Sequence, residues 1–182
     1  DLGVLQTDLH MTIPDKGPAS YQAKLSTNSF ELGKFIDNYQ LGKVAFDGKI
    51  NGKGFNTNDL NIGIDGAISQ LNFNNYTYTN IIAHGEVRKK LFTGTASIND
   101  PNIKIDTLIG SINFSKKDPK FNLEANVSTL HLRDLGFTND SVSLSGKFNL
   151  DFMGSNIDNF LGSAKLYNAV LLDYNQRLSY DS

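Results

Sequence analysis

Histidine is the residue type in this sequence that is best suited to acid–base or metal chemistry, and the chain has three. They are His10, His84 and His131, and none has a second histidine at the HxH or HxxxH spacing that lets two imidazoles bind one metal ion. His131 falls in a segment expected to form a short helix, where a surface position accounts for it. The histidines therefore predict no metal site.

The acidic residues are the second possible source of chemistry. Asp65, Asp100, Asp106 and Asp118 stand where we expect turns and strand ends, which favour aspartate. Their spacing does not suggest the two facing carboxyl groups that glycoside hydrolysis requires. The stretch GKINGKGF (48–55) resembles a phosphate loop, but it continues a strand pattern and no helix follows it. No hydrolase or nucleotide-binding signature is present, so we expect no enzymatic activity and no cofactor.

Composition excludes further classes of function. The 182 residues carry a net charge of -2 from mixed signs, which provides no basic surface for nucleic acid. The absence of cysteine excludes disulfides, thiol catalysis and cysteine-bound metals, and it is compatible with the cytosol or a bacterial periplasm. The longest apolar run, Ala169 to Leu172, is far shorter than the roughly 20 residues of a membrane span. We expect the chain to be an internal segment of a longer polypeptide, with any membrane anchor outside it.

The elements that must position any functional surface are strands. Apolar and polar residues alternate with period two in six stretches, which is typical of strands with one buried face. These stretches are 44–50, 60–68, 92–98, 108–114, 121–127 and 142–152. Turn signals separate them at 51–54, 73–76, 99–102 and 116–119. The spacing predicts a meander of about ten strands.

Only two short stretches have helical character. FELGKFID (30–37) and LHLRDLGF (130–137) are each about two turns long, and Ser29 is a candidate N-cap for the first.

The two helical stretches belong to an internal repeat. LSTNSFELGKF (25–35) resembles VSTLHLRDLGF (127–137), and a similar strand follows each. The Gly-Lys pairs that begin at Gly48 and Gly146 are 98 residues apart. We therefore expect a single repetitive segment over 1–182, with approximate units 1–98 and 99–182, in an array whose units stack on their neighbours.

The apolar side of this sheet needs a cover. Burying one large apolar side chain contributes roughly 1.5–3 kcal/mol, so a wet face on many strands would exceed the 5–15 kcal/mol net stability that is typical of a domain. Two short helices are too small, which leaves the sheet folded on itself or an apolar ligand. Glycines recur within or beside the alternating runs, where they either let the sheet curl into a trough or mark bulges and sandwich corners. These glycines are Gly48, Gly66, Gly94, Gly110, Gly146 and Gly162.

Spaced motifs from residue 78 to residue 137 resemble the TamB group of the AsmA-like superfamily, in its long Bacteroidota forms. The matching patterns are Y.NI...G at 78–85, F.G...I.DPN at 92–102, G.I.FS....P.F.L.A.V at 110–127 and L.L..LGF at 130–137. A looser likeness extends over the whole chain through the repeat.

The resemblance implies a long, curved antiparallel sheet with a U-shaped apolar groove, called a β-taco. It implies a place in the periplasm, within a protein anchored in the inner membrane that reaches a TamA-like barrel partner in the outer membrane. Its groove would pass phospholipid acyl chains between the two membranes. We expect fourteen residues to line that groove: Val44, Phe46, Ile50, Ile62, Ile64, Ile68, Phe121, Leu123, Val127, Val142, Leu144, Phe148, Leu150 and Phe152.

Two other functions fit the same sequence. Open sheet edges could receive strands of nascent outer-membrane β-barrel proteins by β-augmentation. A dry β-sandwich or solenoid could instead serve as a spacer or adhesin.

Overall fold

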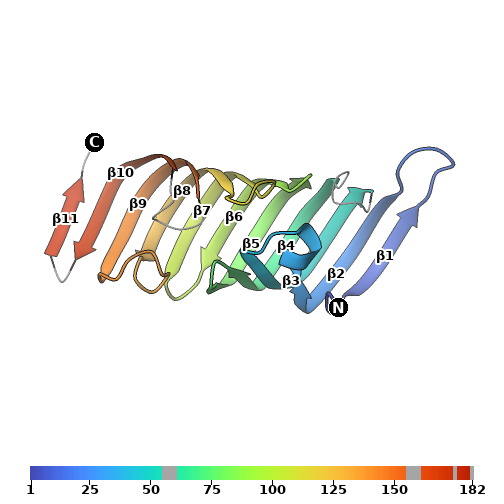
Figure 1. The fold of residues 1–182 in the computed structure, drawn as a ribbon, viewed down its shortest axis with the longest axis horizontal. Helices are drawn as coiled ribbons and strands as arrows, with labels where there is room; N and C mark the ends of the chain where they lie inside the picture. The colour runs from blue at the N-terminus through green and yellow to red at the C-terminus, as the bar shows by residue number, and fades with distance from the viewer. Residues whose placement is uncertain (55–60, 155–160, 174–175, 181–182) are drawn as a thin grey trace.

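The chain folds into one open antiparallel sheet in which the strands lie side by side in chain order (Figure 1). The computed structural model describes residues 1–54, 61–154, 161–173 and 176–180. The strands are β1 (Gln6–Thr12), β2 (Ser20–Glu31), β3 (Leu41–Lys53), β4 (Asn61–Phe73), β5 (Tyr76–Arg88), β6 (Leu91–Asn99), β7 (Ile103–Asn113), β8 (Lys120–His131), β9 (Val142–Met153), β10 (Leu161–Asp173) and β11 (Gln176–Tyr180). The all-β prediction is confirmed, with eleven strands in place of about ten.

The first predicted helix is confirmed and the second is wrong. Helix α1 (Leu32–Ile36) lies over β3 (Figure 1), but its N-cap is Glu31, so the proposed Ser29 cap is also wrong. Residues 132–136 instead form consecutive turns that follow β8. In these turns the N–H of Leu135 donates to the carbonyl of His131, that of Gly136 to Arg133 and that of Phe137 to Leu132. The i→i−4 pattern of an α-helix therefore does not continue, and Gly136 leaves helical geometry with a φ of 78°.

Irregularities in the ladders bend many of the strands. The pairing register shifts between Thr27 and Phe30 in β2 and between Val127 and Leu130 in β8. It also shifts between Tyr167 and Val170 in β10, where Asn168 has a φ of 49°. Such bulges bend a strand and increase its twist, so the sheet does not extend as a flat ribbon.

Aromatic rings join opposite ends of the strands in the bent sheet. We call the strand ends near the turns at 74–75 and 100–102 the first rim, and those near 89–90 and 114–119 the second rim. The ring of Phe73 on the first rim lies with its centroid 6.4 Å from that of Phe114 and 6.4 Å from that of Phe121, both on the second rim. Strands β4 and β8 are not neighbours in the sheet, so the sheet folds over its own apolar face at this point.

The repeat is visible in the hydrogen bonds of the two copies. Glu31 N–H donates to the carbonyl of Leu2 at 2.8 Å, and His131 N–H donates to that of Asn102 at 2.9 Å. Likewise, Gly54 N–H donates to Ala19 at 3.0 Å and Gly154 N–H to Pro119 at 3.1 Å. Equivalent residues are therefore 100 apart at these positions, so that β8, β9, β10 and β11 take the places of β2, β3, β4 and β5, and β1 takes the place of β7.

Candidate functional site

One face of the sheet, here called the inner face, gathers the apolar side chains. Cross-strand partners in antiparallel pairs share a face, and the register opposes Phe46 to Ile68, Ile50 to Ile64, and Leu123 to Leu150. Of the fourteen predicted groove residues, five are buried, and they are Val44, Phe121, Leu123, Val127 and Phe148. Nine are half-buried, and they are Phe46, Ile50, Ile62, Ile64, Ile68, Val142, Leu144, Leu150 and Phe152.

Sequence reasoning missed the inner residues of β5. Tyr76 and Tyr78 face inward at even positions, whereas Ile81 and Ala83 are buried at odd positions. Asn80, with a φ of 51°, stands between the two sets, where the ladder passes from Ile81 to Thr79. This break shifts the alternation by one residue, although the pairing register with β4 is the same on both sides of it, and it hides the period of two. An asparagine at the break was the available signal, because this residue type tolerates positive φ.

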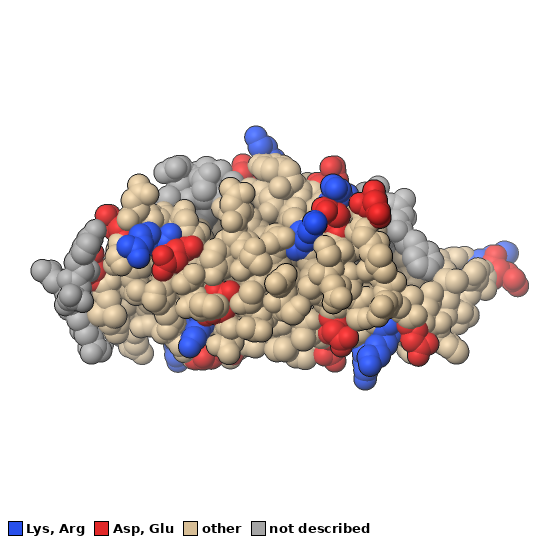
Figure 2. Space-filling model, turned by 90° about the horizontal axis from the view of Figure 1, so that it is seen from below, with Lys and Arg blue, Asp and Glu red and all other residues tan. Residues whose placement is uncertain are grey.

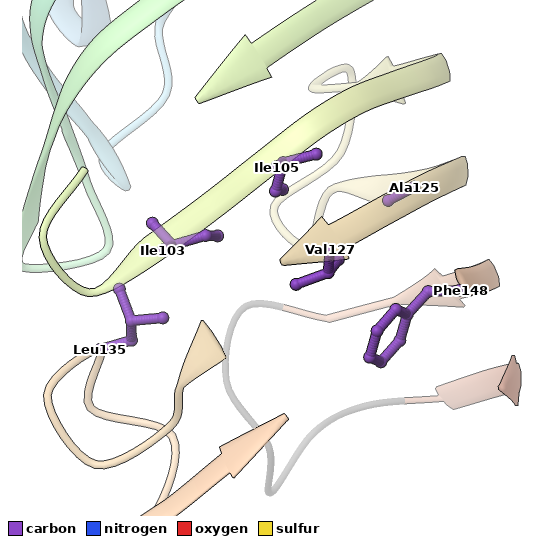
Figure 3. Packing of buried hydrophobic residues seen from close by; sticks show 6 residues of the cluster. All are labelled: Ile103, Ile105, Ala125, Val127, Leu135 and Phe148. Carbon is purple, nitrogen blue, oxygen red and sulfur yellow. The ribbon is translucent and has the colours of Figure 1, made fainter. Parts of the chain in front are cut away.

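The most densely packed part of the inner face lies at β7, β8 and β9. Ile103 and Ile105 of β7, Val127 of β8 and Phe148 of β9 belong to one buried cluster, and Leu135 points toward Ile103 from the turns after β8 (Figure 3). The turns that replace the predicted second helix thus cover part of the inner face. In this region the apolar side chains are sealed by one another.

Paired glycines make room for aromatic rings on the inner face. Gly48 stands opposite Gly66, and a Cβ built at either position would lie less than 3.0 Å from the Phe46 ring. Gly85 and Gly94 form a second pair, and a Cβ at Gly85 would lie 2.9 Å from the Phe92 ring. The rings therefore pack directly on the glycine backbone. At these positions, side chains from both paired strands would collide with the rings and with each other.

Adding a methyl group at one of these paired glycines should destabilise the chain. In Gly66→Ala the new Cβ would lie 2.6 Å from the Asp47 carbonyl oxygen and 2.8 Å from Gly48 Cα, atoms that cannot rotate away. We expect a loss of about 1–3 kcal/mol in the free energy of unfolding, measured by urea titration. The matched variant Ala67→Ser, on the exposed outer face of the same strand, should change it by less than about 0.5 kcal/mol. Equal effects of the two variants would contradict this account of the glycine pair.

The inner face is uncovered near the two ends of the sheet. Leu9 and Met11 of β1 stand opposite the buried Ala23 and Tyr21, yet they are 46% and 44% exposed. At the other end Leu166 of β10 stands opposite the buried Phe148 and is 40% exposed. The apolar surface is therefore continuous through the sheet, sealed in the middle and open to solvent at its ends.

A buried carboxylate accepts several hydrogen bonds at the first rim. Asp100 is 1% exposed and accepts hydrogen bonds from the Tyr76 hydroxyl at 2.5 Å, from the Thr79 hydroxyl at 2.7 Å and backbone N–H at 3.0 Å, and from the Asn102 N–H at 2.9 Å. Burial by itself would raise the pKa of Asp100, but these hydrogen bonds favour the ionised form and hold its pKa below the ordinary value. Burial is also the main cause that raises the pKa of the neighbouring Tyr78 to about 12. The cluster ties the β6–β7 turn to the start of β5.

The outer face of the described strands carries mostly polar side chains, with the exposed Ile82, Ile109 and Tyr167 among them. A hollow of about 510 Å³ over β1 to β5 is lined mostly by polar residues, including His10, Gln22 and Asn51. A hollow of about 290 Å³ lies over β7 to β10, beside Ile109 and Tyr167. Seen from below, toward the ends of the strands, the molecule has acidic and basic side chains interspersed (Figure 2).

The histidines lie on separate strands, so the expected place of His131 in a short helix is wrong. His10 is on β1, His84 on β5 and His131 at the end of β8. His84 Nδ1 lies 2.9 Å from an Asp65 carboxylate oxygen on the exposed surface. Within the described ranges, no three His, Cys, Asp or Glu side chains are grouped so that they could hold a metal ion.

In the part of the chain that the structure describes, no helix has the length and apolar character needed to cross a bilayer. Comparison with known proteins gives no match to a family model, to a curated protein or to a solved structure.

Proposed function

We propose that this chain is a segment of a conduit for hydrocarbon, in which the inner face holds the acyl chains of phospholipids. The observation that carries the proposal is the continuous apolar face, which passes from β1 to β10 and is left exposed at Leu9, Met11 and Leu166. Acyl chains need apolar surface and no directional polar partner. The resemblance of residues 78–137 to the TamB group is the second support. On that resemblance we propose a position in the periplasm, between an inner-membrane anchor and an outer-membrane TamA-like partner.

A guest chain must replace contacts that the protein makes with itself. The Phe73, Phe114 and Phe121 rings join the rims, and such edge-to-face aromatic pairs contribute about 0.5–1.5 kcal/mol each beyond burial. This is comparable to the roughly 0.8 kcal/mol gained by burying one methylene group. An acyl chain with a dozen methylenes therefore has enough binding energy to separate the rims.

The test is photocrosslinking with a phosphatidylcholine whose acyl tail carries a diazirine, in vesicles incubated with the purified chain. We expect adducts, mapped by mass spectrometry, on the inner side chains of β1 and β10. Leu9→Arg should reduce labelling of β1 severalfold, because a guanidinium disfavours hydrocarbon contact. The matched variant His10→Arg, on the polar face of the same strand, should label like the parent chain.

Native mass spectrometry of the chain purified from a bacterial periplasm gives the independent check. Co-purifying phospholipid is the expected result. A chain without bound lipid, whose diazirine adducts spread equally over both faces, would contradict the conduit and favour the dry spacer.

A second candidate function rests on the free edge of β1. This strand pairs only with β2 in the described sheet, so its other side offers unpaired backbone groups to an incoming strand. A scaffold for nascent β-barrel proteins would use such an edge. Site-specific crosslinking along β1 in cells should then capture unfolded barrel proteins, whereas capture of lipid alone would count against the scaffold.

A further inference from the structure

The internal repeat specifies the kind of strand that fits the free edge of β1. Strand β2 corresponds to β8, with Tyr21 in the place of Phe121 and Ala23 in the place of Leu123. Met11 pairs with Tyr21 and Leu9 with Ala23. In the second copy Ile112 pairs with Phe121 and Gly110 with Leu123. Strand β1 therefore holds, in the first copy, the position that β7 holds in the second.

The far edge of β7 is occupied, and its occupant is β6. Ile112 stands opposite Phe92, Gly110 opposite Gly94, and Leu108 opposite Ala96. By equivalence, a strand docked on β1 would place a residue like Phe92 opposite Met11. It would place residues like Gly94 and Ala96 opposite Leu9 and Thr7. The small residues matter, because Leu9 places a large side chain where the second copy has Gly110, and a large residue opposite it would compete for the same space.

We propose that the β1 edge is a docking site for an extended strand of the β6 type. In such a strand every second residue points inward, in the order large residue, Gly, Ala, and the residues between them are uncharged. Such a strand would pair antiparallel with β1 and cover Leu9 and Met11, which are 46% and 44% exposed. Strand β11 holds the position of β5, so a second copy that docked through β11 would skip one strand of the pattern. The edge is therefore suited to a β6-type strand rather than to β11 of another copy.

The absence of cysteine allows a direct test by disulfide trapping. The probe is a synthetic peptide of residues 90–100 (KLFTGTASIND), added to the full 182-residue chain that carries Met11→Cys. With Phe92→Cys in the peptide, the two sulfurs would lie on the same face of adjacent strands, within disulfide reach. With Thr93→Cys the peptide sulfur would point to the other face. We expect the first peptide to be trapped at least about tenfold faster, and His10→Cys in the chain to reverse this preference.

Selectivity for small residues is tested with a third peptide. It carries Phe92→Cys together with Gly94→Leu and Ala96→Leu, which keep the alternation but add bulk opposite Leu9 and Thr7. We expect this peptide to be trapped about tenfold more slowly than the one with the native Gly and Ala. Equal trapping of all three peptides would show that the edge accepts any strand, which would overturn the proposal. Trapping of only a Met11→Cys homodimer would overturn it as well, because the occupant would then be a second β1. None of these outcomes depends on whether the inner face binds lipid.

Discussion

Replacing Phe148 with arginine should abolish cooperative folding of the chain. The side chain is 7% exposed and packs in the cluster with Ile105, Ala125 and Val127 (Figure 3). Removing a buried phenylalanine costs about 3–5 kcal/mol, and an arginine at the same place would add an unpaired buried charge. Together these losses match or exceed the low end of the 5–15 kcal/mol stability that is typical of a domain. The expected readout is the loss of the sigmoidal urea transition followed by circular dichroism.

Two matched variants serve as controls for this prediction. Asn149→Arg changes the adjacent residue, which is exposed on the outer face, and should shift the free energy of unfolding by less than about 0.5 kcal/mol. Leu144→Arg changes a half-buried residue at the margin of the cluster, where the guanidinium can reach water, and should leave the chain folded. A wide-open trough would hydrate an arginine at either inner position. A folded Phe148→Arg chain would therefore contradict the sealed cluster.

Asp100→Asn should be the most damaging conservative change at the first rim. The carboxylate accepts four hydrogen bonds from Tyr76, Thr79 and Asn102, and it is 1% exposed. An amide turns one of the two acceptor atoms into a donor that faces other donors. Because hydrogen bonds to a charged group contribute about 1.5–3 kcal/mol and a buried unpaired donor adds a further cost, we expect a loss of about 3 kcal/mol. Asp106→Asn, whose exposed carboxylate accepts from Ser128 and Asn126, should lose less than about 1 kcal/mol.

The pH dependence of unfolding separates charge from shape at this site. The pKa of Asp100 is lowered in the folded chain, so its stabilising contribution is present above the unfolded pKa of about 4 and is lost as the pH falls through the folded value. The parent chain should therefore lose stability in acid more steeply than Asp100→Asn. Identical acid profiles would show that folding does not lower the pKa of Asp100.

The strand pattern could be predicted from the sequence because alternation is a local property. In residues 121–127 of β8, buried apolar residues such as Leu123 alternate with exposed polar ones, as the sequence predicts. The same logic failed in β5, where Asn80 adopts a positive φ and the alternation shifts by one residue. It also failed at residues 130–137, because the spacing of Leu130, Leu132 and Leu135 fits a helix as well as a strand end followed by turns that return to the core.

Local sequence determined the meander of strands and, in the six alternating stretches, which side of the strand is apolar, since period-two alternation and turn residues act within a few positions. Only the tertiary structure decided how that apolar side is covered. The contact of Phe73 with Phe114 and Phe121, and the burial of Asp100 against Tyr76, join residues from different strands. Their positions depend on the summed bend and twist of the intervening ladders. No single stretch of sequence predicts this total bend and twist, because each bulge adds a rotation whose effect appears only when the strands are assembled.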